Sequence, residues 1–310
     1  MTKLASMSSS FKKRKSRGVA RSLDDYSIEG LSIVLVGIFA LLCLAPFLYV
    51  FFVSFMTYEE YLANPLRIIP RYFSFNAYRQ IWGYALFRSG YRVTLIITFA
   101  GTMLSVFLLV ISAYPLSKSH LKGSRTVMAL ILFTMFFNGG IIPNFILIRN
   151  LGIFDTLWAL ILPGVISAFL LILMMNFMRV TVSESLEEAA KVDGANDIRI
   201  LFTIIVPLIK PAIATMTIFS AVHYWNSYFG AMMFIRDRNL WPLTLVLREL
   251  VVVDTGVAEP VTQMLAAEAR THPFTLRMAA IVITLLPIMA VYPFMQKYFV
   301  KGLALGSIKG

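Results

Sequence analysis

Six stretches of this sequence are long, apolar and free of Asp, Glu, Lys and Arg. The first, residues 31–55, is 25 residues long, and about 20 apolar residues are enough for a helix to cross the hydrocarbon core of a bilayer. The other five are residues 93–116, 126–148, 156–178, 211–235 and 278–296. Because lipid offers the backbone no hydrogen-bond partners, such stretches favour membrane-spanning helices. The sequence therefore predicts an all-α polytopic membrane protein with six transmembrane helices.

Composition and charge placement also point to a membrane protein. Hydrophobic residues make up 58% of the chain and only 14% of residues are charged, against about 25% in a typical soluble domain. The formal net charge is +12, but the basic residues lie in ends and loops without an aromatic stripe, which argues against nucleic-acid binding. In a six-span topology all 11 lysines lie on one side of the membrane. Because basic loops mark the cytoplasmic side, we expect both termini in the cytoplasm.

This topology divides the chain into three parts. Residues 1–27 form a basic cytoplasmic arm, residues 28–300 form the six-span domain, and residues 301–310 form a cytoplasmic tail. Within the domain, residues 179–207 form a polar cytoplasmic loop and residues 236–277 form a long outer loop of mixed charge. Loops this long are commonly functional, so we expect the outer loop to be a docking surface, with a short helix in its stretch VTQMLAAEART.

Helix-breaking residues interrupt three of the predicted spans. The third span contains the run Asn138–Gly140 and then Pro143, the fourth contains Pro163 and Gly164, and the last contains Pro287 and Pro293. Membrane helices tolerate such residues when neighbours or water satisfy the backbone. The third span is therefore either ordinarily kinked or lines a transport path and bends during transport.

The cytoplasmic loop has clear helix signals. Residues 188–211 read EAAKVDGANDIRILFTIIVPLIKP, and two capping-box spacings, residues 181–184 and 185–188, precede strong helix formers. Gly194 favours a left-handed end to this first helix. Asn196 is suited to cap a second helix, which Pro207 ends or bends where the chain returns to the membrane. The sequence thus predicts a helix, a tight turn and a second helix on the cytoplasmic surface.

The first of these two helices has side chains suited to a contact. Ala189 and Ala190 give it a small face that another surface can approach closely, and Glu184, Glu187 and Glu188 give it an acidic rim. These features fit two alternatives, a helix that docks onto a partner protein and an interfacial helix that only braces the bundle.

A family resemblance favours docking. The loop closely resembles the signature loop of the membrane subunits of bacterial ATP-binding-cassette importers, through Glu188, Ala189, Ala190, Asp193, Gly194, Ala195, Phe202, Ile204, Pro207 and Pro211. The stretches FFNGGIIPNFILIRNLGIFDTLWALILPG, HYWNSYF and FVKGLALGSIKG are similar to the maltose- and oligosaccharide-type permeases. The resemblance covers nearly the whole chain from Leu31 onward and leaves out the basic arm.

The resemblance implies a type I importer fold with a cytoplasmic coupling helix in the bacterial inner membrane. It implies a complex with a second homologous permease subunit, in a heterodimer, with two ATPase subunits and with an extracytoplasmic solute-binding protein that the outer loop reaches. It assigns ATP and Mg²⁺ to the ATPase subunits and no cofactor to this chain. The residues implied to couple to the ATPase are Glu184, Glu187, Glu188, Ala189, Ala190, Asp193, Gly194 and Ala195.

Two other classes of function fit the sequence less well. A stand-alone secondary carrier commonly uses charged groups inside its spans for the coupling ion, and the predicted spans contain no Asp, Glu, Lys or Arg. A membrane enzyme needs a catalytic cluster, but the three histidines are scattered, and the chain has no G-x-x-x-x-G-K-[ST] phosphate loop. These absences favour energy delivered from outside the membrane through the loop, as the resemblance implies. His223, in the fifth span, is either a functional group or a hydrogen-bonded residue of the bundle.

The resemblance makes a sugar or oligosaccharide the expected substrate, with small peptides or other organic solutes as alternatives. Sugar recognition uses aromatic stacking with amide, hydroxyl or guanidinium hydrogen bonds. The candidates for the substrate path are Asn138, Asn144, Asn176, Tyr224, Trp225, Asn226 and Tyr228. Helix-to-helix packing is the alternative role for each of them, and we expect two or three of the seven to contact substrate.

Overall fold

The computed structural model describes residues 23–118, 120–251, 263–264 and 272–307, and every regular element in these ranges is a helix. The arm at residues 1–22 and most of the stretch VTQMLAAEART lie outside the described residues. In chain order the elements are α1 (Leu23–Val53), α2 (Tyr58–Ala63), α3 (Asn76–Gly83), α4 (Ala85–Leu116), α5 (Ser124–Phe136), α6 (Ile141–Asn150), α7 (Trp158–Ile161), η1 (Leu162–Gly164), α8 (Ala168–Thr181), α9 (Glu184–Val192), α10 (Asp197–Ile200), η2 (Leu201–Ile205), α11 (Val206–Leu208), α12 (Lys210–Trp225), α13 (Tyr228–Phe234), η3 (Arg238–Leu240), α14 (Leu243–Val251) and α16 (Pro273–Ser307).

Three helices are long and apolar enough to cross a membrane unaided. They are residues 29–53 of α1, the whole of α4, and residues 273–291 of α16. Three further pairs qualify only when each bent pair is counted as one span: α5 with α6, the segment 158–164 with α8, and the segment 197–208 with α12. The described residues therefore contain between three and six candidate spans, and six is the number predicted from the sequence.

The helix breakers act differently in the different spans. The third predicted span is two helices, α5 and α6, that meet at 113°. Gly140 has a φ of +85° at this corner, and the Asn138 side chain accepts a hydrogen bond from its N–H at 3.0 Å. The last span does not behave as expected, because α16 runs unbroken through Pro287 and Pro293 and continues past residue 300 to Ser307. A membrane helix tolerates proline where its surroundings satisfy the freed backbone groups.

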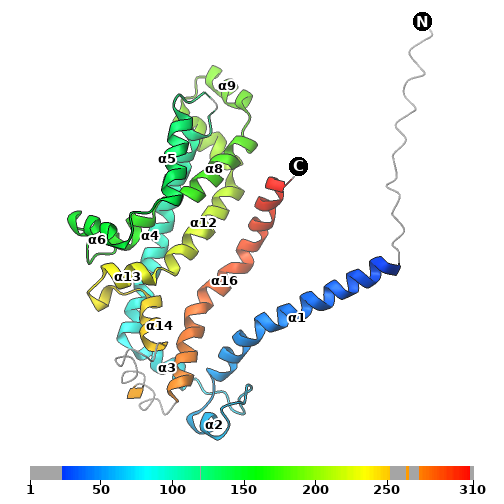
Figure 1. Ribbon diagram of the computed structural model, residues 1–310, viewed down its shortest axis with the longest axis vertical. Helices are drawn as coiled ribbons and strands as arrows, with labels where there is room; N and C mark the ends of the chain where they lie inside the picture. Colours follow the sequence, from blue (N-terminus) through cyan, green and yellow to red (C-terminus); the bar gives the residue numbers. More distant parts are fainter. Residues whose placement is uncertain (1–22, 119, 252–262, 265–271, 308–310) are drawn as a thin grey trace. The chain divides into compact units, whose positions relative to one another are not determined.

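Small residues let α4 and α12 pack closely at the centre of the unit formed by residues 50–310 (Figure 1). Ser105 of α4 and Ser220 of α12 are hydrogen-bonded in the interior, with 3.2 Å between their hydroxyl oxygens. The Tyr224 ring lies over Gly101, and its hydroxyl donates to the Ile161 carbonyl at 3.0 Å. Close contacts through small and hydroxyl residues are typical of helix association in membranes. α4 therefore packs tightly against α12, and Tyr224 of α12 connects both helices to the segment at residues 158–164.

Gly101 gives a direct test of this packing. A Cβ placed on it would lie 2.6 to 2.8 Å from three atoms of the fully buried Tyr224 ring, so Gly101→Ala forces the ring or the helix to move. We expect a loss of about 1–3 kcal/mol, as for other overpacked interiors. Gly37→Ala is the matched control, because an added Cβ there meets no atom within 4 Å. Thermal unfolding in detergent should show a lower midpoint for Gly101→Ala alone, and equal midpoints would refute the contact.

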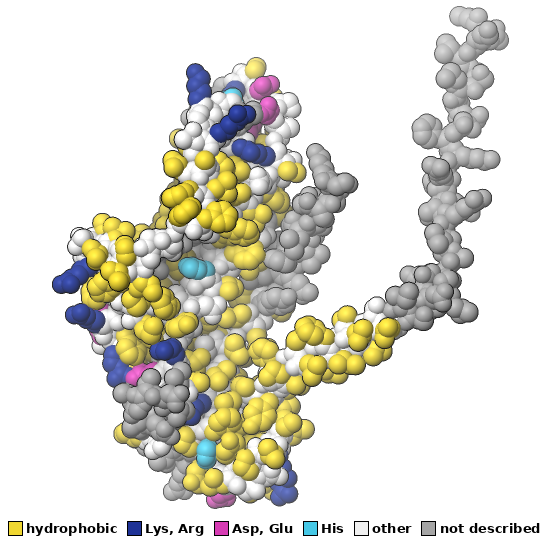
Figure 2. Space-filling view, viewed as in Figure 1, with side chains coloured by type: hydrophobic (Ala, Val, Ile, Leu, Met, Phe, Trp, Pro, Cys, Tyr) yellow, Lys and Arg dark blue, Asp and Glu magenta, His cyan; other side chains and the backbone are white. Residues whose placement is uncertain are grey.

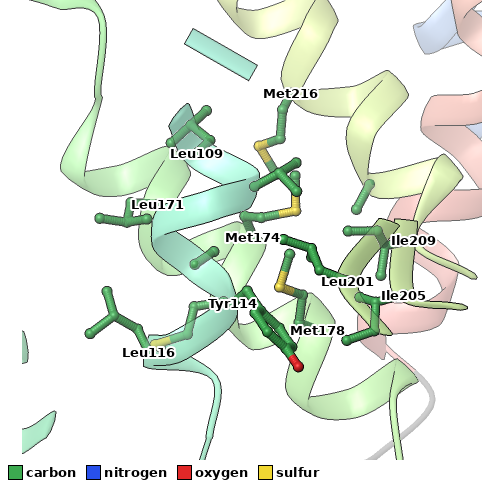
Figure 3. Packing of buried hydrophobic residues seen from close by; sticks show 14 of the residues in the cluster. Leu109, Tyr114, Leu116, Leu171, Met174, Met178, Leu201, Ile205, Ile209 and Met216 are labelled. Carbon is green, nitrogen blue, oxygen red and sulfur yellow. The ribbon is translucent and has the colours of Figure 1, made fainter. Parts of the chain in front are cut away.

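A cluster of buried hydrophobic residues lies between α4, α8, η2 and α12. Figure 3 shows Leu109 and Tyr114 of α4 packed with Met174 and Met178 of α8, and with Leu201 of η2. Ala190 of α9 belongs to the same buried cluster. Figure 2 shows Lys, Arg, Asp and Glu side chains gathered at the end where α9 lies, with a band of hydrophobic side chains beyond them. This core thus lies next to the polar loop at residues 179–207.

Candidate functional site

The first helix predicted in the loop at residues 179–207 is α9, and it starts at Glu184. Its N-cap is Ser183, which makes no side-chain capping bond. Neither predicted capping box forms, and the Ser185 hydroxyl instead donates to that of Ser183 at 3.3 Å. Two acidic residues in the first turn, Glu184 and Glu187, are favourably placed for the positive end of the helix dipole.

The end of α9 follows the sequence prediction closely. Gly194 has a φ of +80°, its N–H donates to the Lys191 carbonyl at 3.0 Å, and the Ala195 N–H reaches back to the Ala190 carbonyl at 3.0 Å. These two bonds define a Schellman turn, which requires a left-handed residue after the helix. Asn196 then caps α10, since its side chain accepts from the Arg199 N–H at 2.8 Å. The chain thus makes the predicted helix, turn and helix.

The two alanines of α9 do not share a face. Consecutive helical residues are about 100° apart, and accordingly Ala190 is buried while Ala189 is exposed. Leu186 and Val192 are exposed together with Ala189. The outward side of α9 therefore combines a small residue with apolar ones, and Ile198 and Phe202 extend the exposed apolar surface into the second helix.

The predicted acidic rim is also smaller than expected. Glu184 and Glu188 are exposed, but Glu187 is only 8% exposed and forms an ion pair with Lys118. Glu187 faces inward because it lies one turn from Ala190, on the same buried side of the helix. No local pattern predicts this pair, because its two members are 69 positions apart.

Three of the seven predicted path residues line one cleft of about 890 Å³. They are Asn138 and Asn144, at the corner between α5 and α6, and Asn226, at the end of α12. The Asn144 amide donates to the Asn138 side-chain oxygen at 3.4 Å, and the Asn226 amide donates to the Val222 carbonyl at 2.9 Å. No Asp or Glu is among the described residues that line this cleft. Its polar groups are amides, a serine hydroxyl and an imidazole, set among apolar side chains.

The other four predicted path residues lie outside that cleft. Tyr224 and Trp225 are buried among helices, and Tyr224 also lines a smaller cleft of about 400 Å³. Asn176 and Tyr228 are exposed but do not line the cleft. The sequence did not separate these groups, because Asn226 follows Tyr224 and Trp225 directly and only the end of α12 turns it outward.

His223 lies at the junction of two clefts. It lines both the cleft with Asn226 and a smaller one of about 400 Å³ that also includes Ser105 and Ser220. Gly164 makes room for it, because a Cβ at that position would be 2.6 Å from the imidazole Nε2. The lack of a side chain at Gly164, in the break between α7 and α8, therefore leaves space for the His223 imidazole.

The first part of the predicted outer loop contains a packed helix. Its described part includes α14, whose Leu243 and Val246 are buried against α4 and α16. Arg238 and Glu249 form an ion pair at its surface. Most of the residues behind the predicted docking role, at 252–262 and 265–271, lie outside the described residues.

Asp155 links the short loop between α6 and α7 to the start of this region by hydrogen bonds. Its carboxylate accepts hydrogen bonds from the Arg236 N–H at 2.8 Å and the Asp237 N–H at 3.0 Å, and its own N–H donates to the Phe234 carbonyl at 2.9 Å. The two backbone hydrogen bonds lower the pKa of Asp155, and the nearby Arg236 adds to them. Asp155 has a φ of 60°, a conformation that Asn also adopts readily.

This arrangement predicts a pH dependence. A carboxyl whose folded pKa is lowered stabilises the fold above its ordinary pKa, near 3.8, and that stability is lost as the pH falls through the lowered value. We expect Asp155→Asn to unfold at a lower temperature than the parent at pH 6, because the neutral amide accepts weaker hydrogen bonds. The difference should shrink as the pH falls below the ordinary Asp range. A difference that stays constant down to pH 3 would show that the charge is not responsible.

The described residues contain no group of three or more His, Cys, Asp or Glu placed to hold a metal ion. The candidate site therefore consists of a polar cleft within the helices and the exposed helix α9. Neither part contains a described cluster suited to metal-assisted chemistry.

Comparisons with known proteins agree with this arrangement. Residues 81–305 match the family described as "Binding-protein-dependent transport system inner membrane component". A polygalacturonan/rhamnogalacturonan transport system permease of Bacillus subtilis is 43% identical over 88% of this chain and 94% of its own length. A melibiose/raffinose/stachyose import permease of the same organism is 28% identical over 78% of this chain and 84% of its own length.

A solved structure agrees as well. A chain from the crystal structure of a bacterial ABC transporter involved in the import of the acidic polysaccharide alginate superposes with a TM-score of 0.84, at 36% identity, over 90% of this chain and 99% of its own. The chain therefore belongs to the family of binding-protein-dependent transport system inner membrane components: it is a multi-pass, non-catalytic permease subunit of an importer in which ATP is bound by the ATPase partners.

Proposed function

We propose that α9 is the coupling helix of this permease and that its outward side docks onto an ATPase subunit. The observation that carries this proposal is the exposed apolar surface formed by Leu186, Ala189 and Val192 of α9 and by Ile198 and Phe202 after the turn. Glu184 and Glu188 flank it with negative charge. An exposed apolar patch rimmed by polar residues is typical of a protein interaction site.

The proposed complex has five chains. This subunit pairs with a second, homologous permease, each permease receives one ATPase subunit, and a solute-binding protein docks outside. Both termini and the loop at residues 179–207 lie in the cytoplasm, and residues 236–277 lie outside. When ATP closes the ATPase dimer, α9 is drawn inward and the helices rotate to open the path outward. Hydrolysis then resets the path.

Purification of the tagged permease from its native membrane tests this assembly. We expect one or two ATPase chains and a second permease to copurify, with ATP hydrolysis that rises when a solute-loaded binding protein is added. Efficient solute uptake by this chain alone, without an ATPase, would instead support a secondary carrier and refute the proposal.

Labelling with a membrane-impermeant thiol reagent tests the orientation. In a Cys43→Ala background, a cysteine at the exposed outer residue Asn239 should react in intact cells, and one at Ser185 of α9 should react only after lysis. Basic loops motivate this orientation. Reaction of the Ser185 site in intact cells would overturn both the topology and the docking role of α9.

We propose further that the substrate is an acidic oligosaccharide, built from uronic acids. Two similar proteins are named for polygalacturonan/rhamnogalacturonan and for alginate. The cleft lined by Asn138, Asn144, His223 and Asn226 supports this, because it offers hydrogen-bond donors and contains no described Asp or Glu that would repel a carboxylate. Uptake of a galacturonate trisaccharide should therefore exceed that of raffinose, a neutral trisaccharide. Preference for the neutral sugar would refute the acidic assignment and leave the importer role intact.

A further inference from the structure

The buried side of α9 contacts the rest of the permease through an ion pair and through little apolar surface. Ala190 is its only buried hydrophobic residue among those described, and an alanine contributes little apolar area. The other buried residue is Glu187, whose carboxylate pairs with the Lys118 ammonium. Their side chains are only 11% and 15% exposed, respectively. The pair is therefore a buried side-chain link between α9 and the rest of the bundle.

Lys118 connects this link to α4. It lies two residues beyond Leu116, the last residue of α4, and its ammonium lies over the Tyr114 ring, 4.1 Å from the ring centroid. A cation over an aromatic face is attracted by the ring electrons. Tyr114 is buried within the core formed by α4, α8 and η2 (Figure 3). The lysine is thus held between the Glu187 carboxylate on one side and a core residue of α4 on the other.

The end of α4 is itself held in place. Arg179, in the last turn of α8, donates from Nη2 to the Leu116 carbonyl at 2.8 Å and from Nε to the Ser117 carbonyl at 3.3 Å. A cation at a helix C-terminus satisfies its free carbonyls and complements the dipole. These bonds limit independent movement of the segment that carries Lys118. A displacement of Lys118 is therefore transmitted to α4 rather than absorbed by the loop.

α4 then leads to the cleft region. Ser105, in the middle of α4, bonds to Ser220 of α12 and lines the smaller cleft beside His223. Gly101, one helical turn from Ser105 in α4, lies against the Tyr224 ring. The Tyr224 hydroxyl donates a hydrogen bond to the Ile161 carbonyl, where the break between α7 and α8 begins. A continuous set of contacts thus runs from Glu187 of α9 to the residues around the cleft.

We propose that the Lys118–Glu187 ion pair transmits the movement of α9 to α4, so that Glu187 is a positioning residue inside the permease and not a contact for the ATPase. This inference rests on the proposed docking of α9. Breaking a buried ion pair leaves one charge without its partner, and in that state α9 can move with the ATPase while α4 stays behind. ATP is then hydrolysed without transport.

The experiment reconstitutes the complete importer in liposomes and measures solute uptake per ATP hydrolysed. Glu187→Lys and Lys118→Glu are compared with the double variant that exchanges the two charges. We expect each single variant to lower this ratio at least about tenfold, because each places two like charges together in a buried site. The double variant should recover most of the ratio, since it restores an opposite pair. Arg67→Met is the control and should keep the parental ratio, because it breaks an ion pair with Glu60 of α2, 3.6 Å between charged atoms, at the end of the molecule away from α9 (Figure 1).

Three results would overturn the proposal. If Glu187→Gln releases the ATPase on purification and the exchange of charges rescues nothing, then Glu187 contacts the ATPase. If the single variants only lower the unfolding temperature and leave uptake per ATP unchanged at a lower assay temperature, the pair is merely structural. If the double variant stays as uncoupled as the single ones, the pairing of opposite charges is not what matters. Failure of the docking proposal itself appears separately, as absence of an ATPase from the parental complex.

Discussion

Gly194→Val should abolish the solute-stimulated ATPase activity of the assembled importer while the chain still inserts in the membrane. At Gly194 the backbone has a φ of +80°, which glycine adopts freely and β-branched residues adopt only with strain. An added Cβ would meet no atom within 4 Å in this chain, so the effect comes from the backbone and not from a clash within the permease. Valine therefore disrupts the Schellman turn that sets the direction of α10 relative to α9.

Gly194→Asn separates the two possible reasons for glycine at this position. Asparagine tolerates the left-handed conformation, so this variant should retain most of the stimulated activity if only the backbone matters. Loss of activity in the asparagine variant as well would mean that the ATPase approaches too closely for any side chain. Normal stimulation in Gly194→Val would refute the role of the turn in coupling. ATPase rates with and without loaded binding protein, normalised to purified complex, provide the measurement.

The sequence predicted the helical elements well because their signals are local. Runs without charge marked the spans, and the turn after α9 followed from the left-handed preference of Gly194 and the capping ability of Asn196. These signals depend on neighbours in the chain and on the properties of lipid. They therefore needed no knowledge of how the helices pack.

Features that depend on contacts distant in sequence were not predictable in the same way. Nothing in the local pattern distinguished inward Glu187 from outward Glu188, because the partner Lys118 belongs to another loop. The 113° corner at Asn138–Gly140 was expected only as a break in a span. The close approach of the Tyr224 ring to Gly101 was also not predictable, because the two residues are far apart in the sequence.

Removal of polar side chains from the large cleft should strongly reduce solute uptake. Asn226→Leu and His223→Leu each remove hydrogen-bonding groups from exposed positions of the large cleft, and leucine is apolar with a similar size. A site built to hydrogen-bond a polar substrate loses about 1.5–3 kcal/mol for each bond to a charged group, so we expect uptake to fall about ten- to hundredfold in either variant. The ATPase should still copurify, because both residues are far along the chain from α9.

Asn176→Leu is the matched control for these variants. Asn176 is an exposed asparagine of α8 that does not line the cleft, so the same chemical change there should leave uptake within about twofold of the parent, as for most exposed substitutions. His223→Asn should retain part of the uptake lost in His223→Leu, because an amide keeps a donor and an acceptor. Equal loss in Asn176→Leu and Asn226→Leu would show that polarity of the helix surfaces in general, and not this cleft, determines transport. Normal uptake in both leucine variants of the cleft would place the substrate path elsewhere in the complex.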